Sequence, residues 1–453
     1  MRHIRPRALA LALALTVAAP ASAADWSTPK RISDVSTFAS RPFIAFNASG
    51  RGLAGFEQQF GLGNAGHNRL FLANRDAAGG FGRPRRLGPD ELFLGGLWLD
   101  RRGRSTVLAV FSKGGQRDRM EVYSGAGAGS FGRPQVLRTS PYTFMRTPKL
   151  AADAAGDASA IWRELPRQSA GSDVAMLATR SAGHPFGRVR RVSSAGVVDV
   201  EVAMGGNGDF VVTWLRRGLV EARIGHGSKL GPVLRLANNH RERGVSLAVT
   251  MDARGDALVA WTSHARTLIP SATEHANLAY RPAGHGFMPL KQVASWGIQP
   301  QLTMGGVGAA FYATGKAVVA WNGRDAGGDG VFAVPATRGI PGAVGRLSSP
   351  IPQPGVEEHD QLQAVAGGRG LASVGWTHFG PAGAATESQG HLLVSDLSPA
   401  GRFTLQPVTG PTVAALDATL AYGPRDLVAL WRTQASVQAF TTPHEFIDAS
   451  ARR

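Results

Sequence analysis

One short pattern recurs about every 53 residues along nearly the whole chain, and it constrains the fold more than any other feature. In each copy, an Asp, Asn or Gly opens a turn that contains Gly, and a short apolar stretch then ends in an aromatic residue. Asp153-Ala154-Ala155-Gly156, for example, leads to Trp162. The aromatic residues that end the copies are Phe56, Phe111, Trp162, Trp214, Trp261, Trp321, Trp376 and Trp431. A constant period of this length is typical of an architecture built from one supersecondary unit per copy.

Each copy predicts four short antiparallel strands. The turn residues favour a hairpin, because Asp hydrogen-bonds its own backbone and Gly supplies the positive φ that a tight turn needs. In the third copy, a third strand is expected at Val174–Ala178 and a fourth at Phe186–Val192. Gly and Pro recur too often for amphipathic helices, and no 3.6-residue period is sustained. Four-stranded units repeated in this way predict an all-β fold, the β-propeller.

The two ends of the repeat predict how the propeller closes. The segment Trp26–Ile32 has the spacing of a fourth strand, yet it precedes the first complete copy. The last copy offers three strands, the third at Val437–Phe440, and no fourth. We therefore expect the N-terminal strand to complete the last blade, which hides both exposed sheet edges. The repeat predicts eight blades over residues 24–440 and a C-terminal tail at 441–453, with seven blades as the alternative because two fourth strands are degenerate.

The first 23 residues predict a leader rather than part of the fold. Three Arg precede the apolar run Ala8–Ala19, and Ala21-Ser22-Ala23 supplies the small residues of a cleavage site. The run is too short for a membrane span, which needs about 20 apolar residues. We expect secretion, to an extracellular or periplasmic location, with no membrane span. The chain has no Cys, which excludes a disulfide scaffold, a zinc–thiolate site and a cysteine nucleophile.

The repeated pattern resembles that of secreted bacterial β-propeller repeat proteins, distantly similar to sialidase and TolB-type propellers. The resemblance covers nearly all of the chain after the leader. It implies the fold and no specific family, because the spacing differs from that of a sialidase Asp-box. Asp252 precedes Gly255 by three residues, and Gly255 precedes Trp261 by six.

The candidate binding residues follow the aromatic anchors, in segments expected to be loops on the face that holds the ligand in propellers. They are Arg163, Glu164, Arg216, His264, Arg324, His378 and Arg432. Several Arg at one mouth can bind a carboxylate, sulfate or phosphate through paired hydrogen bonds, although solvated loop charges are the alternative. The two His lack metal-ligand spacing, so no metal and no cofactor is expected.

The sequence therefore predicts a non-catalytic binding or scaffold module, most simply a monomer. The formal charge of +17 is consistent with an anionic polysaccharide as partner, and an extracellular protein is the other choice. Nucleic acid is not expected, because no basic run with interleaved aromatics occurs. The alternative is a sialidase-like hydrolase or lyase that cleaves glycans in the propeller mouth, with Glu164 paired to Glu357 or Asp360. The repeated Asp and Trp residues are interpreted as turn and packing residues.

Overall fold

The computed structural model describes most of the chain after the leader. It covers residues 26–34, 38–60, 67–113, 117–140, 143–166, 172–216, 218–238, 242–265, 273–297, 306–348, 358–367, 370–379, 390–398, 401–409, 415–435 and 444–452. These residues form an all-β fold without an α-helix. In this described part, no helix is long and apolar enough to cross a membrane. The expected leader, residues 1–23, lies outside the described residues.

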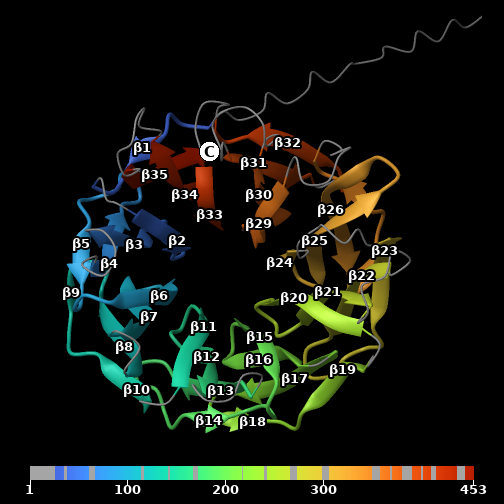
Figure 1. The fold of residues 1–453 in the computed structure, drawn as a ribbon, viewed down its shortest axis with the longest axis horizontal. Helices are drawn as coiled ribbons and strands as arrows, with labels where there is room; N and C mark the ends of the chain where they lie inside the picture. Colours follow the sequence, from blue (N-terminus) through green and yellow to red (C-terminus); the bar gives the residue numbers. More distant parts are fainter. Residues whose placement is uncertain are drawn as a thin grey trace, which may run out of the picture.

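Eight antiparallel sheets are arranged as the blades of a closed ring (Figure 1). Blade 1 consists of β2 (Phe38–Phe46), β3 (Gly52–Phe60), β4 (His67–Arg75) and β5 (Arg85–Leu87). Blade 2 consists of β6 (Leu92–Leu99), β7 (Arg104–Ser112), β8 (Asp118–Ala126), β9 (Ser130–Phe131) and β10 (Gln135–Ser140). Blade 3 consists of β11 (Thr143–Ala152), β12 (Ala158–Pro166), β13 (Val174–Arg180) and β14 (Arg190–Arg191). Blade 4 consists of β15 (Val197–Met204), β16 (Asp209–Arg216), β17 (Leu219–His226), β18 (Lys229–Leu230) and β19 (Leu234–Asn238).

The second half of the ring follows the same plan. Blade 5 consists of β20 (Glu242–Met251), β21 (Ala257–Ala265), β22 (Thr273–Arg281) and β23 (Lys291–Gly297). Blade 6 consists of β24 (Val307–Ala313), β25 (Lys316–Asp325), β26 (Gly328–Thr337), β27 (Ile340–Pro341) and β28 (Gly345–Arg346). Blade 7 consists of β29 (Glu358–Ala366), β30 (Ala372–Phe379), β31 (Gly390–Leu397) and β32 (Phe403–Pro407). Blade 8 consists of β33 (Ala415–Tyr422), β34 (Leu427–Ala435), β35 (His444–Arg452) and β1 (Lys30–Arg31). The prediction of eight blades is confirmed, and the alternative of seven is excluded.

The N-terminal strand completes the last blade, as the sequence predicted. In β1, Lys30 pairs with Ala449 and Arg31 with Asp448 of β35. The prediction for the C-terminus was wrong in one respect. Residues 444–452, expected to belong to a tail, form β35, the third strand of this blade. The third strand had been expected at Val437–Phe440, which lies outside the described residues.

The repeated Asp residues shape the hairpin turns, which confirms their structural interpretation. The Asp153 carboxylate accepts hydrogen bonds from the backbone N–H groups of Ala155, Gly156 and Asp157, at 2.9, 2.8 and 3.0 Å. Gly156 has a φ of 103°, which a residue with a Cβ rarely adopts. Asp100 and Asp252 accept equivalent bonds in blades 2 and 5. The turn therefore explains why an acid recurs in these blades.

The aromatic anchors pack between blades, because each lies on the second strand and contacts the preceding blade. Trp162 of blade 3 is fully buried in a cluster with Leu108, Val110 and Met120 of blade 2. Eight clusters of this kind join every neighbouring pair of blades around the ring, including blade 8 to blade 1. The repeat pattern is thus mainly a pattern of contacts between blades.

The innermost strands carry the irregularity that shapes the centre of the ring. Seven of them shift register in their first half, and β24 does so near its C-terminal end. A bulge leaves residues unpaired and re-aims their side chains. In β11, the shift leaves Thr147 and Pro148 between the paired residues Arg146 and Lys149. These bulges bring polar side chains to the wall of the central channel.

Candidate functional site in the central channel

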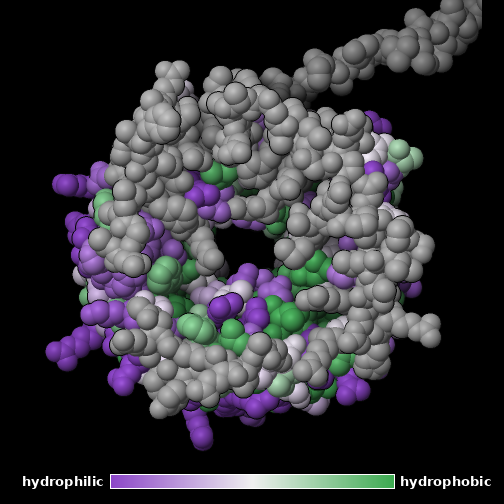
Figure 2. Space-filling view, in the orientation of Figure 1, coloured by the Kyte–Doolittle hydropathy of each residue, from purple (hydrophilic) through white to green (hydrophobic). Residues whose placement is uncertain are grey.

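The innermost strands of seven blades enclose a channel with a cavity of about 700 Å³. Figure 2 shows that the ring is open at its centre, with hydrophobic and hydrophilic residues both reaching the opening. The residues that line it are Pro42, Phe43, Thr147, Lys149, Asp199, Glu201, Ser246–Val249, Gly306–Ala309, Leu362–Val365 and Asp417–Thr419. A concave site that combines apolar side chains with convergent polar groups is a usual form of a ligand site, and this lining contains both kinds.

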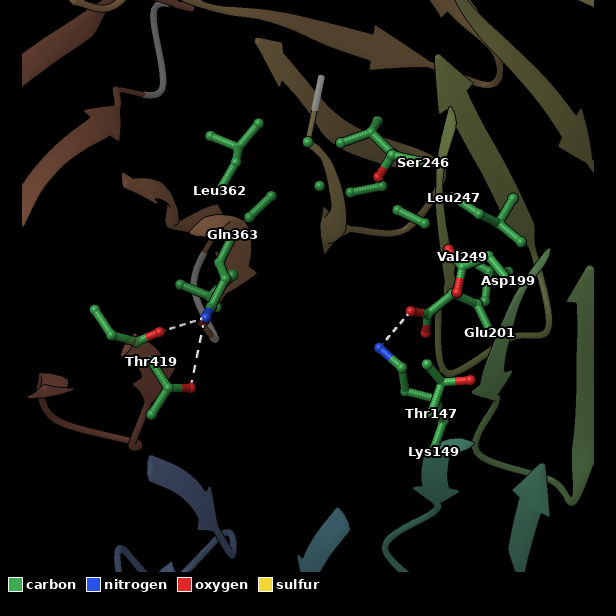
Figure 3. Close-up of a pocket in the computed structure, with 18 of the residues that line it drawn as sticks. Thr147, Lys149, Asp199, Glu201, Ser246, Leu247, Val249, Leu362, Gln363 and Thr419 are labelled. Atoms are coloured by element: carbon green, nitrogen blue, oxygen red, sulfur yellow. Dashed lines mark hydrogen bonds and ion pairs between the residues drawn. The ribbon is translucent and has the colours of Figure 1, made fainter. Parts of the chain in front are cut away.

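Two carboxylates and one ammonium group form the charged side of the channel. Asp199 and Glu201 lie two residues apart on β15, so both side chains point to the same face of the strand. The Nζ atom of Lys149, on the neighbouring blade, lies 2.6 Å from Oε1 of Glu201. Figure 3 shows this ion pair at one side of the cavity. The three side chains therefore form one cluster across the boundary between blades 3 and 4.

The protonation of Asp199 is changed by its surroundings in the channel wall. Burial, and then the neighbouring Glu201 charge, raise the pKa of Asp199 to about 6, although Lys149 opposes this shift. One backbone hydrogen bond, from the N–H of Val200 at 2.8 Å, partly stabilises the charged form. The carboxyl group of Asp199 therefore titrates in mildly acidic solution. It lies beside Glu201, which forms the ion pair with Lys149.

The opposite wall of the channel is polar but uncharged at its centre. The Gln363 side chain on β29 donates to the carbonyl oxygen of Ala418 at 2.7 Å and accepts from the N–H of Leu420 at 3.1 Å. The Thr419 hydroxyl donates to the same Gln363 oxygen at 3.4 Å. Figure 3 shows this amide across the cavity from Lys149. The hydrogen bonds hold the first strands of blades 7 and 8 together at the channel wall.

Strained backbone conformations occur at two positions of the channel lining. Thr147 has a φ of 46° and Asp417 a φ of 44°, both in the left-handed region. A β-branched residue such as Thr is unfavourable there, and such strain is concentrated at functional sites. Both residues lie at register shifts of an innermost strand, in blades 3 and 8. The bulges thus stabilise a conformation that the side chain alone disfavours.

The arginines predicted to bind a ligand lie in or at the end of second strands rather than in loops, and each is paired with an acid. Their partners are Asp173 for Arg163, Glu221 for Arg216, Asp329 for Arg324 and Asp417 for Arg432. These arginines do not converge as free cations, because the paired acids neutralise them. Arg163 also acts electrostatically on Asp199, and Arg432 pairs with a channel residue, so these two support the channel wall.

Glu164 occupies a different place from the one proposed for a catalytic acid. Its side chain is 5% exposed, and its carboxylate lies 3.1 Å from Nε of Arg138 on the neighbouring blade. The indole N–H of Trp162 donates to it at 3.2 Å. Glu164 is therefore part of the contact between blades 2 and 3. Of the acids proposed as its partners, Glu357 and the side chain of Asp360 lie outside the described residues.

His264 and Arg324 belong to one charged cluster, which joins blades 5 and 6. Glu274 lies opposite His264 in the sheet and accepts a hydrogen bond from the indole of Trp296 at 2.7 Å. Burial raises the pKa of Glu274, and Asp329, the partner of Arg324, adds to the increase. His378 is half-buried on β30. Within the described ranges, no group of three His, Asp or Glu side chains is arranged to hold a metal ion.

The channel cluster was missed by the reasoning from sequence, although a signal was present. In β15, Asp199 and Glu201 alternate with Val residues, in the order Val-Val-Asp-Val-Glu-Val. Alternation in a strand predicts one apolar and one polar face. Since strands of a propeller are apolar on both faces where blades pack, two acids on one face indicate a surface that no blade covers.

The comparisons with known proteins identify no family. No protein-family model matches the sequence, and no curated protein matches it. Similar solved structures include Sqt1 of Chaetomium thermophilum bound to the N-terminus of ribosomal protein L10, at 11% identity over 90% of this chain and 96% of that one, with a TM-score of 0.48. They also include the NanB sialidase of Streptococcus pneumoniae, at 10% identity over 95% and 70% of the chains and a TM-score of 0.40. A Hadza microbial sialidase matches at 9% identity over 63% of each chain, with a TM-score of 0.39. As expected, sialidases occur among these structures, and identities this low describe no more than the fold.

Proposed function

We propose that the protein is an exported, monomeric binding module that holds a segment of an extracellular protein in its central channel. The observation that carries this proposal is the channel itself, with the ion-paired cluster of Lys149, Asp199 and Glu201 on one wall. Export rests on the leader at residues 1–23. Arg163 and Arg432 act here as positioning residues, because they pair with acids at the channel wall.

The charge of the channel favours a ligand segment with a basic side chain. Of the three carboxylates in the lining, Glu201 is paired with Lys149 and Asp417 with Arg432. The carboxyl group of Asp199 therefore remains to attract a cationic group, and an anionic ligand would be repelled by it once it is ionised. Half-buried apolar residues of the lining, such as Phe43 and Val249, would contact aliphatic parts of the same segment. A Lys or Arg flanked by apolar residues fits both features.

Selection from a random displayed-peptide library tests this proposal. The wild-type protein should enrich peptides that combine Lys or Arg with apolar residues, and the double variant Asp199→Asn/Glu201→Gln should bind them at least tenfold more weakly. The matched control is Asp34→Asn/Asp76→Asn, which removes two exposed acids outside the channel lining. Failure to enrich any peptide, or equal loss of binding in both double variants, would reject channel binding.

Glycan cleavage is a second candidate, and the two neighbouring carboxyl groups on β15 favour it. Burial raises the pKa of Asp199 to about 6, and the ammonium group of Lys149 pairs with Glu201. A carboxyl group with a raised pKa beside a second carboxyl group is a usual arrangement for acid–base chemistry on glycosidic bonds. Incubation with neutral and acidic polysaccharides, followed by measurement of new reducing ends, tests it. The activity should be lost in Asp199→Asn and in Glu201→Gln separately, and no release from any substrate would reject it.

A further inference from the structure

A basic groove follows the boundary between blades 1 and 2, on the outside of the ring. Two adjoining hollows of about 420 and 570 Å³ share Arg85, Ala128 and Gly129 in their linings. Arg83 lines one hollow and Arg86 the other. Figure 2 shows hydrophilic residues gathered along this outer edge, over β4 and β5. The groove is separate from the central channel, with which it shares no lining residue.

Hydrogen bonds between the two blades make the floor of the groove a defined structure. Nη1 of Arg85 donates to the carbonyl oxygen of Gly129 at 3.1 Å. The N–H of Ala128 donates to the side-chain oxygen of Asn74 at 2.7 Å. Asn74 lies on β4, and Ala128 and Gly129 form the turn between β8 and β9. The groove therefore has a floor of backbone and arginine that both blades contribute.

Two arginines in the lining, Arg86 and Arg119, are paired with acids, and the other arginines of this edge are not. Glu121 is buried and binds Arg119 and the Tyr123 hydroxyl, at 2.8 and 2.7 Å. Asp90 pairs with Arg86 at 2.8 Å and with Arg69 at 3.0 Å. Arg83, Arg85 and Arg133 are exposed and form no ion pair within the described residues. Arg133 lies beside the groove, between the lining residues Gly132 and Pro134, and is not itself part of the lining.

We propose that this groove binds an acidic polysaccharide, with Arg83, Arg85 and Arg133 contacting its carboxylate or sulfate groups. Guanidinium groups match the planar, two-oxygen geometry of these anions. Three uncompensated charges spread over two blades fit successive groups of a polymer better than one small anion. Because the groove lies outside the channel, this proposal is independent of the proposed function.

A polysaccharide fits the groove better than a nucleic acid. Single-stranded nucleic acid is held by exposed aromatic side chains on which bases stack. The lining contains two aromatic residues, Tyr123, which is buried, and Phe131, which is half-buried and packs against the same core of blades 1 and 2. Both rings are therefore packed into the core, whereas the arginines remain available for charged groups of a sugar chain.

Chromatography of the full-length protein on immobilised heparin tests the inference. The wild type should be retained in 50 mM NaCl, and the triple variant Arg83→Ala/Arg85→Ala/Arg133→Ala should bind roughly tenfold more weakly, with a shallower dependence on salt. The matched control is Arg254→Ala/Arg338→Ala/Arg402→Ala, which removes three exposed arginines in blades 5, 6 and 7, away from the groove. Circular dichroism should show the same fold for all three proteins, because every substituted side chain is exposed.

Four outcomes would overturn the proposal. The first is that the wild type passes through the heparin column, and the second is that the control variant loses as much affinity as the groove variant. The third is that sulfate at 10 mM elutes the protein as well as a heparin oligosaccharide does, which would indicate a small-anion site. The fourth is that immobilised DNA retains the wild type more tightly than heparin does and that the same three substitutions abolish this retention, which would assign the groove to nucleic acid.

Discussion

Trp162 shows how one residue of the repeat serves two blades at once. Its ring is fully buried among side chains of blades 2 and 3, and its N–H donates to Glu164. Glu164 in turn pairs with Arg138 on β10, the outermost long strand of blade 2. A residue with these contacts is required for packing, and it is not accessible to a ligand.

Substitution of Trp162 should therefore reduce stability rather than binding. We expect Trp162→Ala to lower the free energy of unfolding by about 3–5 kcal/mol, the usual cost of removing a fully buried large aromatic side chain. Trp98→Ala, in the half-buried position of β6, is the control and should cost less. Urea denaturation followed by tryptophan fluorescence measures both. A loss below 1 kcal/mol for Trp162→Ala would contradict the packing role.

Asp199 should make stability depend on pH. Between about pH 4 and 6 the folded protein keeps a proton on Asp199 that the unfolded chain has released, because the pKa is about 6 in the folded state and about 3.9 in the unfolded state. The free energy of unfolding should therefore decrease as pH rises through this interval. Asp199→Asn should remove this contribution, so the variant gains stability relative to the wild type above pH 6 and not below pH 4. Thermal unfolding of both proteins from pH 3.5 to 7.5 tests this, and parallel profiles would refute it.

The sequence predicted the ion-pair partners of individual side chains least well. Arg163 and Arg216 stood out because they follow the anchors, but the acids that neutralise them, Asp173 and Glu221, follow later in the sequence. The sheet register explains how Arg216 and Glu221 meet. Glu221 lies opposite Trp214, which is two residues before Arg216 on the same strand and therefore on the same face. Pairing between strands is a tertiary property, so a list of charged residues cannot separate a free cation from a neutralised one.

Among the elements, β1 and β35 determine whether the ring is closed. Besides their two paired residues, Ile32 donates its N–H to the carbonyl oxygen of Ile447 at 2.9 Å. The Ser33 hydroxyl accepts from the N–H of Ile447 at 2.7 Å. These bonds join the two ends of the chain, more than 400 residues apart.

A proline in β1 should weaken the closure of the ring. Lys30 is exposed, so Lys30→Ala should change stability by less than 0.5 kcal/mol, whereas Lys30→Pro removes a backbone donor from the paired strand. We expect Lys30→Pro to cost about 1–2 kcal/mol and to promote self-association through the exposed edge of β35. Thermal unfolding and light scattering measure the two effects. Equal behaviour of the two variants would show that β1 contributes nothing to closure.

The strands were predicted well where the turn pattern is regular and poorly where it is absent. The hairpin around Asp153 and Gly156 follows from local chemistry, and the structure confirms it. β35 was missed because its sequence, His-Glu-Phe-Ile-Asp-Ala-Ser-Ala-Arg, has charged residues and no following turn. It is a strand because β34 and β1 pair with it on its two sides. Hydrogen bonding to a strand at the other end of the chain therefore stabilises β35, and the local sequence does not show this pairing.

The whole molecule is a circle of shared cores. No blade has a hydrophobic core of its own among the described residues, because each of the nine clusters combines two neighbouring blades. If one blade unfolded, the clusters on both of its sides would be exposed to water. Each neighbouring blade would then keep its hydrophobic contacts on one side only. Linear repeat arrays can unfold from an end, since stability there is a sum over neighbours. A closed ring has no end, so we expect it to unfold as one unit.

Trp431→Ala tests this expectation at the closing blade. Trp431 is fully buried between blades 7 and 8. If the ring unfolds as one unit, the variant should lower the protection of core amides in blades 3 and 4, on the far side of the ring, by the same free energy as in blades 7 and 8. Native-state hydrogen exchange read by mass spectrometry measures this for each blade. Loss of protection confined to blades 7 and 8 would show that the blades open separately, and that closure of the ring does not couple them.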